Sequence, residues 1–479
     1  MTQKAILIFH LLLCTFFLVA QDENEPVTGS QQLAIVPFDY ASDSTHQSID
    51  DITTGFFSSP FSIKSFIEEI SYGKATIEGT VYDYRRNQPP LFGQGYTNCF
   101  PVDDVIASQP DVDYSNIDNI VLMVHDTVSK SCAAGNSSFS KLPFSTPNGN
   151  LSFRRSGFRT QFFTPHEFSG ISNSTVAHEL LHSFGISYHS NSYIKKEGEF
   201  EIQAYGNLFD IMGLRSQASH PCALIKEQKG WLTENEIRRV QSSDTLRIYP
   251  LEKKLPGQTQ CVVIDLPNDL DLQPNDDLLF SKIYIEYRGL TGFDQRSIRR
   301  IRLNDGSNYT LDAPHGALIY GIDCQLNDDY CLPVLIDMHP EPIGGLGASY
   351  IPHEASDAQL LLNESYSVPN SDLTIQVTEV APGEYIEVVI NMDMVSAVEE
   401  KPLSNLRVYP NPAHDMIHVS GMEGTEIRSH IYDAHGKLVL TVSNTRHINI
   451  SALQPGTYIV ELTHSITGQK STQKIVVSR

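Results

Sequence analysis

Residues 174–189 read STVAHELLHSFGISYH, and this stretch decides the organisation of the first half of the chain. His178 and His182 are four residues apart, so on a helix their imidazoles lie one turn above each other and can reach one cation. Glu179 lies beside them, where a carboxylate can take a proton from a water molecule. The pattern therefore predicts a metal-binding helix. The apolar residues that form its opposite, buried stripe are Val176, Leu180 and Phe184.

The residues after this helix supply the third metal ligand. Gly185 follows His182 by three residues and can end the helix, so the chain can turn back and complete a tripod that leaves a fourth position for water. We take His189 as the third ligand, with Tyr188 as its competitor. A different arrangement, with a glutamate about twenty residues downstream of the helix, would use Glu197, Glu199 or Glu201 instead.

Several separate motifs carry a resemblance to a known group of proteins. Residues 204–213, AYGNLFDIMG, resemble a Met-turn, in which Met212 would pack beneath the metal-bound histidines. Residues 229–232, KGWL, and residues 61–79, with SYGK at their centre, are similar to segments of the same metallopeptidases. The group is that of the immune inhibitor A and gametolysin-like families, which are zinc peptidases of the metzincin type.

The resemblance covers about residues 31–240 and implies an α/β (α+β) catalytic domain with zinc bound by His178, His182 and His189. In the metzincin pattern the third histidine stands three residues after the glycine, where this chain has Tyr188. The run HSNSY at 189–193 is similar to the family's run after its third ligand and favours His189. Glu179 would then act as the general base in peptide hydrolysis. Tyr205 and His220 are candidates to assist the zinc in stabilising the oxyanion.

The start of the chain predicts export. Ala5 to Ala20 is almost wholly apolar, follows Lys4 and gives way to acidic residues, and it is short for a membrane span. We expect a signal peptide over 1–20, cleaved after Ala20, and no transmembrane segment in the mature chain. A lipoprotein attached through Cys14 fits less well, because a leucine precedes that cysteine.

Length and strand patterns indicate three folded units after the signal peptide. The 479 residues carry 34 basic and 57 acidic side chains, a net charge of −23 that disfavours nucleic acid as a partner. Alternating strand-like runs without a clear helix predict an antiparallel β-sandwich after the catalytic domain. The expected boundaries are a linker at 21–30, the protease domain at 31–244, the β-sandwich at 245–395 and a second linker at 396–404.

Residues 405–479 again form short alternating strands, with the motifs VYPNP at 408–412, IYDAHGK at 431–437 and LQPGTYIV at 453–460. They closely resemble the C-terminal sorting domain of the type IX secretion system of Bacteroidetes. This resemblance implies an Ig-like β-sandwich that directs the chain across the outer membrane, to the cell surface or the medium, through contact with the secretion machinery. An Ig-like spacer or adhesion module is the alternative.

Six cysteines remain once Cys14 leaves with the signal peptide, an even number that suggests disulfides in an exported chain. Our expected pairing joins Cys99 to Cys132, Cys222 to Cys261, and Cys324 to Cys331, and the alternative is buried free thiols. An oxygen-rich cluster could bind calcium, although a solvated acidic loop is the simpler interpretation. Its residues are Asp269, Asp271, Asn275, Asp276 and Asp277.

Together these features predict a secreted zinc metalloendopeptidase that acts on protein or peptide substrates. Two alternatives stay open. One is a noncatalytic surface-binding or adhesion protein on a protease scaffold, which the presence of Glu179 disfavours. The other is metal-dependent hydrolysis of a substrate other than a peptide.

Overall fold

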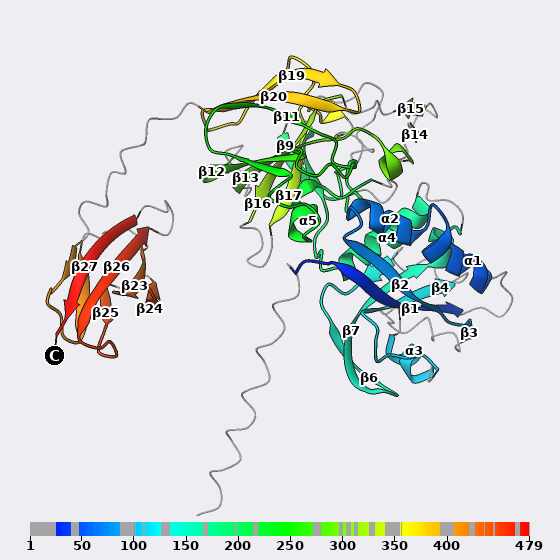
Figure 1. The fold of residues 1–479 in the computed structure, drawn as a ribbon, viewed down its shortest axis with the longest axis horizontal. Coiled ribbons are helices and arrows are strands. Elements are labelled where there is room, and N and C mark those ends of the chain that lie inside the picture. The colour runs from blue at the N-terminus through cyan, green and yellow to red at the C-terminus, as the bar shows by residue number, and fades with distance from the viewer. Residues whose placement is uncertain are drawn as a thin grey trace, which may run out of the picture. The chain divides into compact units, whose positions relative to one another are not determined.

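The described parts of the chain form two compact units, Met1–Met392 and Asp393–Arg479, each rich in strands and poor in helices (Figure 1). The predicted signal peptide, Cys99 and Cys132 lie outside the described residues. The computed structural model describes residues 25–39, 47–86, 100, 102–108, 111–125, 135–165, 171–196, 199–213, 219–271, 279–296, 300–302, 308–310, 315–324, 331–340, 355, 357–392, 407–420, 427–434, 436–443, 446–464 and 470–478.

The first unit begins with a mixed sheet in the order β2-β1-β4-β7-β5, in which β5 alone on this path runs antiparallel to its neighbour. Two short strands extend it, β3 beside β1 and β6 beside β7. The strands are β1 (Gly29–Asp39), β2 (Ala75–Val81), β3 (Arg85–Arg86), β4 (Asn119–His125), β5 (Gly135–Ser137), β6 (Leu142–Thr146) and β7 (Gly149–Arg159).

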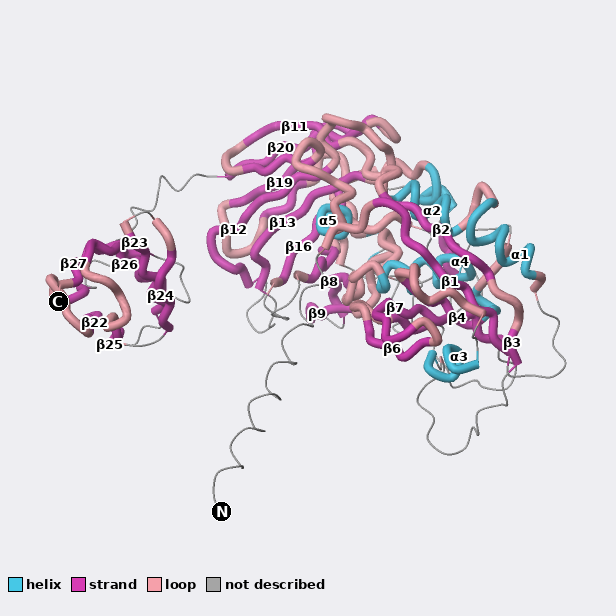
Figure 2. The backbone as a smooth tube through the Cα atoms, turned by 60° about the horizontal axis from the view of Figure 1, so that its bottom comes forward, coloured by secondary structure: helices cyan, strands magenta, loops and turns pink. Residues whose placement is uncertain are grey.

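Helices cover both faces of this sheet, which is why its strands are apolar on both sides. In β1, Leu33 and Ile35 pack with the helices α2 (Ile63–Ile70) and α4 (Ile171–Ser183), whereas Ala34 packs on the other face with α3 (Val102–Ser108). Burial on both faces accounts for the continuous apolar run of β1 from Leu33 to Val36. Figure 2 shows α2 and α4 beside the strands. A short helix, α1 (Ile49–Thr53), continues as a π-helical turn over Thr54–Ser58.

The second half of this unit is a sandwich of two sheets that share one apolar core. The larger sheet has the order β10-β12-β13-β16-β17-β8-β9, and the smaller one β11-β20-β19-β18. The strands of the larger sheet are β8 (Asn191–Lys196), β9 (Glu199–Gln203), β10 (Ile237–Val240), β12 (Cys261–Asp271), β13 (Leu279–Tyr287), β16 (Ala317–Asp323) and β17 (Leu332–Ile336). The strands of the smaller sheet are β11 (Asp244–Ile248), β18 (Ser365–Ser367), β19 (Leu373–Ala381) and β20 (Tyr385–Met392).

This arrangement differs from the antiparallel β-sandwich expected at 245–395. The larger sheet is mixed, because β10 pairs in parallel with β12 and β17 pairs in parallel with β8. Three of its strands, β8, β9 and β10, come from residues before 245, so the expected boundary lies inside a compact unit. The alternation of apolar and polar residues along a strand indicates which face is buried. It carries no information about which distant strand pairs with it.

The cysteines follow the predicted pairing in one case and depart from it in another. Cys324 and Cys331 form a disulfide. Cys222 and Cys261 are both buried free thiols, so the expected bond between them is wrong. Each sits in the apolar core shared by the first sheet and the sandwich, Cys222 just before the helix α5 (Ala223–Gln228) and Cys261 at the start of β12. Burial in an apolar core accounts for such thiols without a bond.

The second unit is also a two-sheet sandwich with its own apolar core. The order is β21-β22-β25 in one sheet and β24-β23-β26-β27 in the other, with every pairing antiparallel. Its strands are β21 (Arg407–Tyr409), β22 (Met416–Ser420), β23 (Ile427–Asp433), β24 (Leu438–Ser443), β25 (His447–Asn449), β26 (Gly456–His464) and β27 (Lys470–Val477).

Candidate metal centre

Three histidines converge at the C-terminal part of α4. His178 and His182 come from the helix and His189 from the segment that follows it. One ligand atom from each of them lies within 4.8 Å of the others, and the Nε2 atoms of His182 and His189 are 3.1 Å apart. The structure thus brings together the three residues that the sequence singled out.

Backbone carbonyls orient two of these imidazoles. His178 Nδ1 lies 2.8 Å from the carbonyl oxygen of Ile211, and His182 Nδ1 lies 2.6 Å from that of Ile186. A carbonyl oxygen only accepts hydrogen bonds, so each Nδ1 carries the proton and each Nε2 keeps a lone pair. Metal-binding histidines generally have such a hydrogen bond on the ring nitrogen that does not touch the metal, and the donor set fits a zinc ion.

Burial also favours the neutral form of His182. His182 is 4% exposed, and burial lowers its pKa to about 4, against the opposing effect of its hydrogen bond to Ile186. A neutral imidazole is the form that coordinates a metal ion. At neutral pH His182 therefore needs no deprotonation before it can bind a cation.

Tyr188 and His189 point into different surroundings, which decides between the two candidate ligands. The Tyr188 side chain is buried in the apolar core, and its hydroxyl donates a hydrogen bond to Gln228 Oε1 at 2.6 Å. Burial raises the pKa of this hydroxyl well above its usual value. His189 faces His182 instead, so the geometry favours His189.

Of the glutamates in the alternative arrangement, Glu201 has a described side chain and is not part of this cluster. Glu197 lies outside the described residues, and Glu199 and Glu201 are in β9. Within the described parts of the chain, the group of converging ligand atoms comprises the three histidines alone.

Glu179 is nearly buried between α4 and the edge strand β5. It is 5% exposed, and its Oε2 accepts a hydrogen bond from the Ser137 hydroxyl at 3.1 Å. The backbone of β5 approaches closely, because a Cβ atom added to Gly135 would lie 2.4 Å from Glu179 Oε1. A side chain at 135 would therefore push the Glu179 side chain out of its position. The sequence motif identified Glu179, but Ser137 and Gly135 carried no signal that linked them to it.

Two aromatic rings lie against the histidines. The Tyr205 ring centroid is 3.9 Å from that of His189, and the Phe139 centroid is 5.4 Å from that of His182. Phe139 is 36% exposed, so it forms an apolar surface next to the cluster. Tyr205 was expected near the site and is found there. Phe139 was not anticipated, because it lies in a loop far from the motif in sequence.

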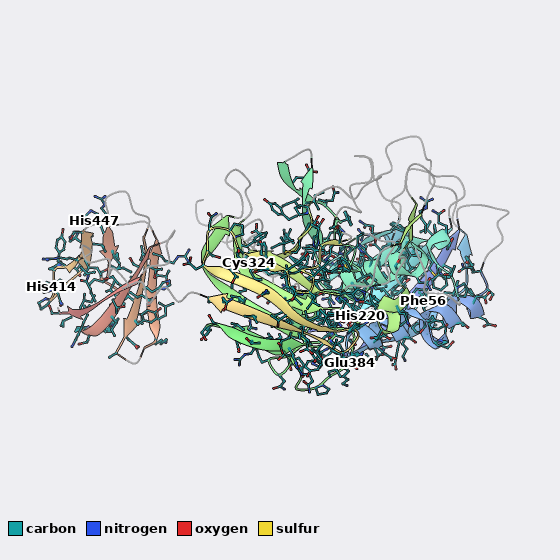
Figure 3. The ribbon with its side chains drawn as sticks, turned by 90° about the horizontal axis from the view of Figure 1, so that it is seen from above. Phe56, His220, Cys324, Glu384, His414 and His447 are labelled. Atoms are coloured by element: carbon teal, nitrogen blue, oxygen red, sulfur yellow. A yellow bond between two sulfur atoms is a disulfide. The ribbon has the colours of Figure 1, made fainter. Side chains whose placement is uncertain are left out.

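His220, the other candidate helper, belongs to a separate buried network. Its Nε2 is 2.9 Å from Glu69 Oε1, and its Nδ1 is 3.0 Å from Lys226 Nζ. Burial, with added repulsion from Lys226 and Arg288, lowers its pKa well below the usual value. These contacts occupy both ring nitrogens, so the structure gives His220 a structural role. Figure 3 labels His220 inside the first unit.

The turn around Met212 is tightly held. Met212 is fully buried, and its backbone N–H donates to Asp210 Oδ1 at 2.8 Å. The other carboxylate oxygen of Asp210 accepts from the Cys222 N–H at 2.9 Å. A Cβ atom added to Gly213 would lie 1.8 Å from the Asn207 carbonyl oxygen, so glycine is required there. The Ile211 carbonyl that orients His178 belongs to the same turn.

Residues of the sandwich hold the segment that follows this turn. Arg288, 1% exposed, forms ion pairs with Glu286 at 2.8 Å and Asp294 at 3.0 Å. Its guanidinium also donates to the His220 carbonyl at 3.2 Å. Burial works against the charge, but the two carboxylates outweigh it and raise the pKa of Arg288 well above its usual value. Charged residues buried in this way have no local sequence pattern, and we did not predict them.

Two of the motifs that carried the resemblance also contact each other. Lys74 Nζ, in the SYGK segment, donates to the carbonyls of Gly230 and Trp231, in the KGWL segment, at 3.1 and 2.7 Å. The indole nitrogen of Trp231 donates to the Val27 carbonyl at 2.8 Å. These bonds tie the segment after the turn to the first strands of the sheet. The motifs therefore form one structural assembly around α4.

The calcium interpretation lies mostly beyond the described residues. Asn275, Asp276 and Asp277 are outside them, while Asp269 and Asp271 fall at the end of β12. Calcium binding stays a prediction.

Comparison with known proteins identifies the second unit. Residues 407–478 match the family described as the secretion system C-terminal sorting domain. This segment is a type IX secretion sorting domain, so the chain is exported to the cell surface or secreted. In the described part of the chain, no helix is both long and apolar enough to span a membrane.

Two further similarities are limited. A stretch of 79 residues is 37% identical to beta-agarase D of Zobellia galactanivorans, and it covers 16% of this chain and 16% of that relative. A structure of PorZ, described as an essential surface component of the type IX secretion system of Porphyromonas gingivalis, shares 12% identity. The match covers 46% of this chain and 39% of PorZ, with a TM-score of 0.15, which establishes no common fold.

Proposed function

We propose that this chain is an exported zinc endopeptidase of the metzincin type. The observation that carries the proposal is the convergence of His178, His182 and His189, with the buried carboxylate of Glu179 on the same helix. The turn that contains Met212 supports it, because that turn supplies the carbonyl that orients His178. Export by the type IX route is consistent with an enzyme that acts on proteins outside the cell.

The residues of this chain would divide the work of peptide hydrolysis. A zinc ion bound by the three imidazoles would polarise the scissile carbonyl and make water more acidic. Glu179 would take the proton from the attacking water and pass it to the leaving amine. The Ser137 hydroxyl, which donates to Glu179 Oε2, would hold that carboxylate in position during both transfers. The Phe139 ring would line the substrate side of the cluster.

The proposal is tested by hydrolysis of casein with the purified full chain. We expect activity that a chelator removes and added zinc restores. Glu179→Gln and Glu179→Ala should retain zinc and lose about 10²- to 10⁴-fold in rate, the usual contribution of a general base. Exposed Glu78 offers a matched control, and Glu78→Gln should hydrolyse casein at the rate of the unaltered chain.

Each outcome of this experiment distinguishes between the candidate functions. Equal rates for Glu179→Gln and the unaltered chain would exclude Glu179 as the base. Zinc binding without any hydrolysis of casein or unfolded peptides would favour the noncatalytic surface-binding alternative. Chelator-sensitive hydrolysis of an ester or amide, with no action on peptides, would favour another substrate class.

A further inference from the structure

A row of aromatic side chains crosses one sheet of the sorting domain. Tyr409 of β21 pairs with His418 of β22, and His418 pairs with His447 of β25. Directly paired residues in a sheet point to the same side, so the three side chains share one face. Tyr409 and His447 are exposed and His418 is half-buried. Figure 3 labels His447 on this unit.

The two imidazoles of this row face each other through their ring nitrogens. His418 Nδ1 and His447 Nδ1 are 2.5 Å apart, and the ring planes are inclined at 86° with centroids 4.7 Å apart. The Tyr409 ring centroid is 5.6 Å from that of His418. Two nitrogen lone pairs repel at this separation unless a proton or a cation lies between them. The two Nδ1 atoms are thus close enough to share one proton or, with the rings turned slightly apart, to bind one cation.

The backbone that carries the pair is fixed by burial of its neighbours. Ile417 and Val419, on either side of His418, and Ile448, next to His447, all lie in the core of the second unit. Successive side chains of a strand point to opposite faces of the sheet. The apolar neighbours therefore anchor one face in the core, and the two histidines lie on the other face. Little conformational entropy is lost when both side chains bind one ligand, which favours chelation.

We propose that His418 and His447 bind a divalent transition-metal ion on the sorting domain. Imidazole suits zinc, copper and nickel ions, whereas calcium and magnesium prefer oxygen ligands. The exposed position leaves the remaining coordination sites to water or to a group from a partner. The site belongs to a different unit from the His178 cluster, so it does not depend on the proposed protease function.

Copper binding by the full chain tests this site, because Cu²⁺ forms the tightest complexes with such ligands in the first-row series. Equilibrium dialysis against Cu²⁺ at pH 7.5 should show one equivalent fewer in His447→Ala and in His418→Ala than in the unaltered chain. The electron paramagnetic resonance signal of the lost equivalent should show coordination by nitrogen. His414→Ala changes an exposed histidine of the same unit outside the row and should bind copper like the unaltered chain.

Casein hydrolysis by His447→Ala should equal that of the unaltered chain, which separates this site from the first centre. Thermal unfolding without metal checks that the variant folds, and His447→Gln offers a second variant with a similar volume. Copper binding by either His447 variant at the level of His414→Ala would overturn the proposal. Loss of one bound copper ion per chain in both His447 variants, with folding retained, would support the proposal.

Discussion

The Nδ1 atom of His178 lies 2.8 Å from the carbonyl oxygen of Ile211, 33 residues further along the chain. This bond joins α4 to the turn that contains Met212, so the position of a ligand imidazole depends on a turn outside its own helix. Asp210 holds this turn, because its carboxylate accepts hydrogen bonds from the N–H groups of Met212 and Cys222. The geometry of the candidate centre is therefore set by long-range contacts as much as by the helix.

Replacement of His189 should abolish tight zinc binding, whereas replacement of Tyr188 should not. His189→Ala removes one of three converging ligands, and we expect zinc affinity to fall by more than the roughly 10- to 100-fold that loss of a supporting residue costs. Tyr188→Phe loses a hydrogen bond to Gln228, worth about 1 kcal/mol of folding free energy. Zinc content after dialysis against a competing chelator measures the difference. Zinc loss in Tyr188→Phe alone would make Tyr188 the ligand.

Arg288→Met should destabilise the first unit strongly, because Glu286 and Asp294 would remain buried without their cation. We expect the free energy of unfolding to fall by about 3–5 kcal/mol, the usual cost of breaking a buried ion pair. Zinc affinity should fall as well, since the chain beyond the turn loses its anchor at the His220 carbonyl. Denaturant unfolding and zinc content provide the two measurements.

Arg247 is a matched control for Arg288. It lies in the smaller sheet of the sandwich and pairs with Glu379 and Glu387, but it is 46% exposed. Arg247→Met should lower the free energy of unfolding far less, because exposed ion pairs contribute little. If Arg247→Met and Arg288→Met lowered the free energy of unfolding equally, burial would not explain the large effect expected at Arg288.

Lys226 should make the stability of the first unit depend on pH. Burial, together with repulsion from Arg288, lowers its pKa to about 7. In the unfolded chain the pKa is about 10.4, so between pH 7 and pH 10 folding releases a proton. Raising the pH from 7 to 9 should therefore stabilise the unaltered chain relative to Lys226→Met, by up to about 1.4 kcal/mol per pH unit. If the difference in free energy of unfolding between the two proteins did not change from pH 7 to pH 9, Lys226 would stay charged in the folded chain.

Alkylation of the unreduced chain should distinguish the two kinds of cysteine. Cys324 and Cys331 are bonded and should not react, whereas Cys222 and Cys261 should react only after denaturation because they are buried. Mass spectrometry should then find two added groups, or four if Cys99 and Cys132 are also free. No added group after denaturation would mean that Cys222 and Cys261 are bonded after all.

Local features of the fold followed from the sequence. The helix α2 begins at Ile63, and the Ser62 side chain accepts a hydrogen bond from the Ser65 N–H, an interaction typical of serine before a helix. The histidine pair on α4 likewise needed only the spacing of four residues. These features depend on neighbours within one or two turns, which the sequence displays directly.

Other features depended on contacts that the sequence does not display. The choice between Tyr188 and His189 rested on which side chain enters the core beside Gln228. The pairing of β8 with β17 joins segments about 140 residues apart, and nothing in either strand specifies the other. The network around Arg288 consists of ordinary charged residues whose burial is evident only once the strands are assembled.

The pairing of β8 with β17 also limits how this chain can be divided. The hairpin β8–β9 follows His189 directly, yet its neighbouring strand belongs to the sandwich. A recombinant fragment that stops near residue 244 would leave that hairpin with an open edge, and edges of this kind invite aggregation. For the same reason, gene fusion or domain exchange could not transfer the histidine cluster alone. The smallest transferable piece runs to the end of β20, at Met392.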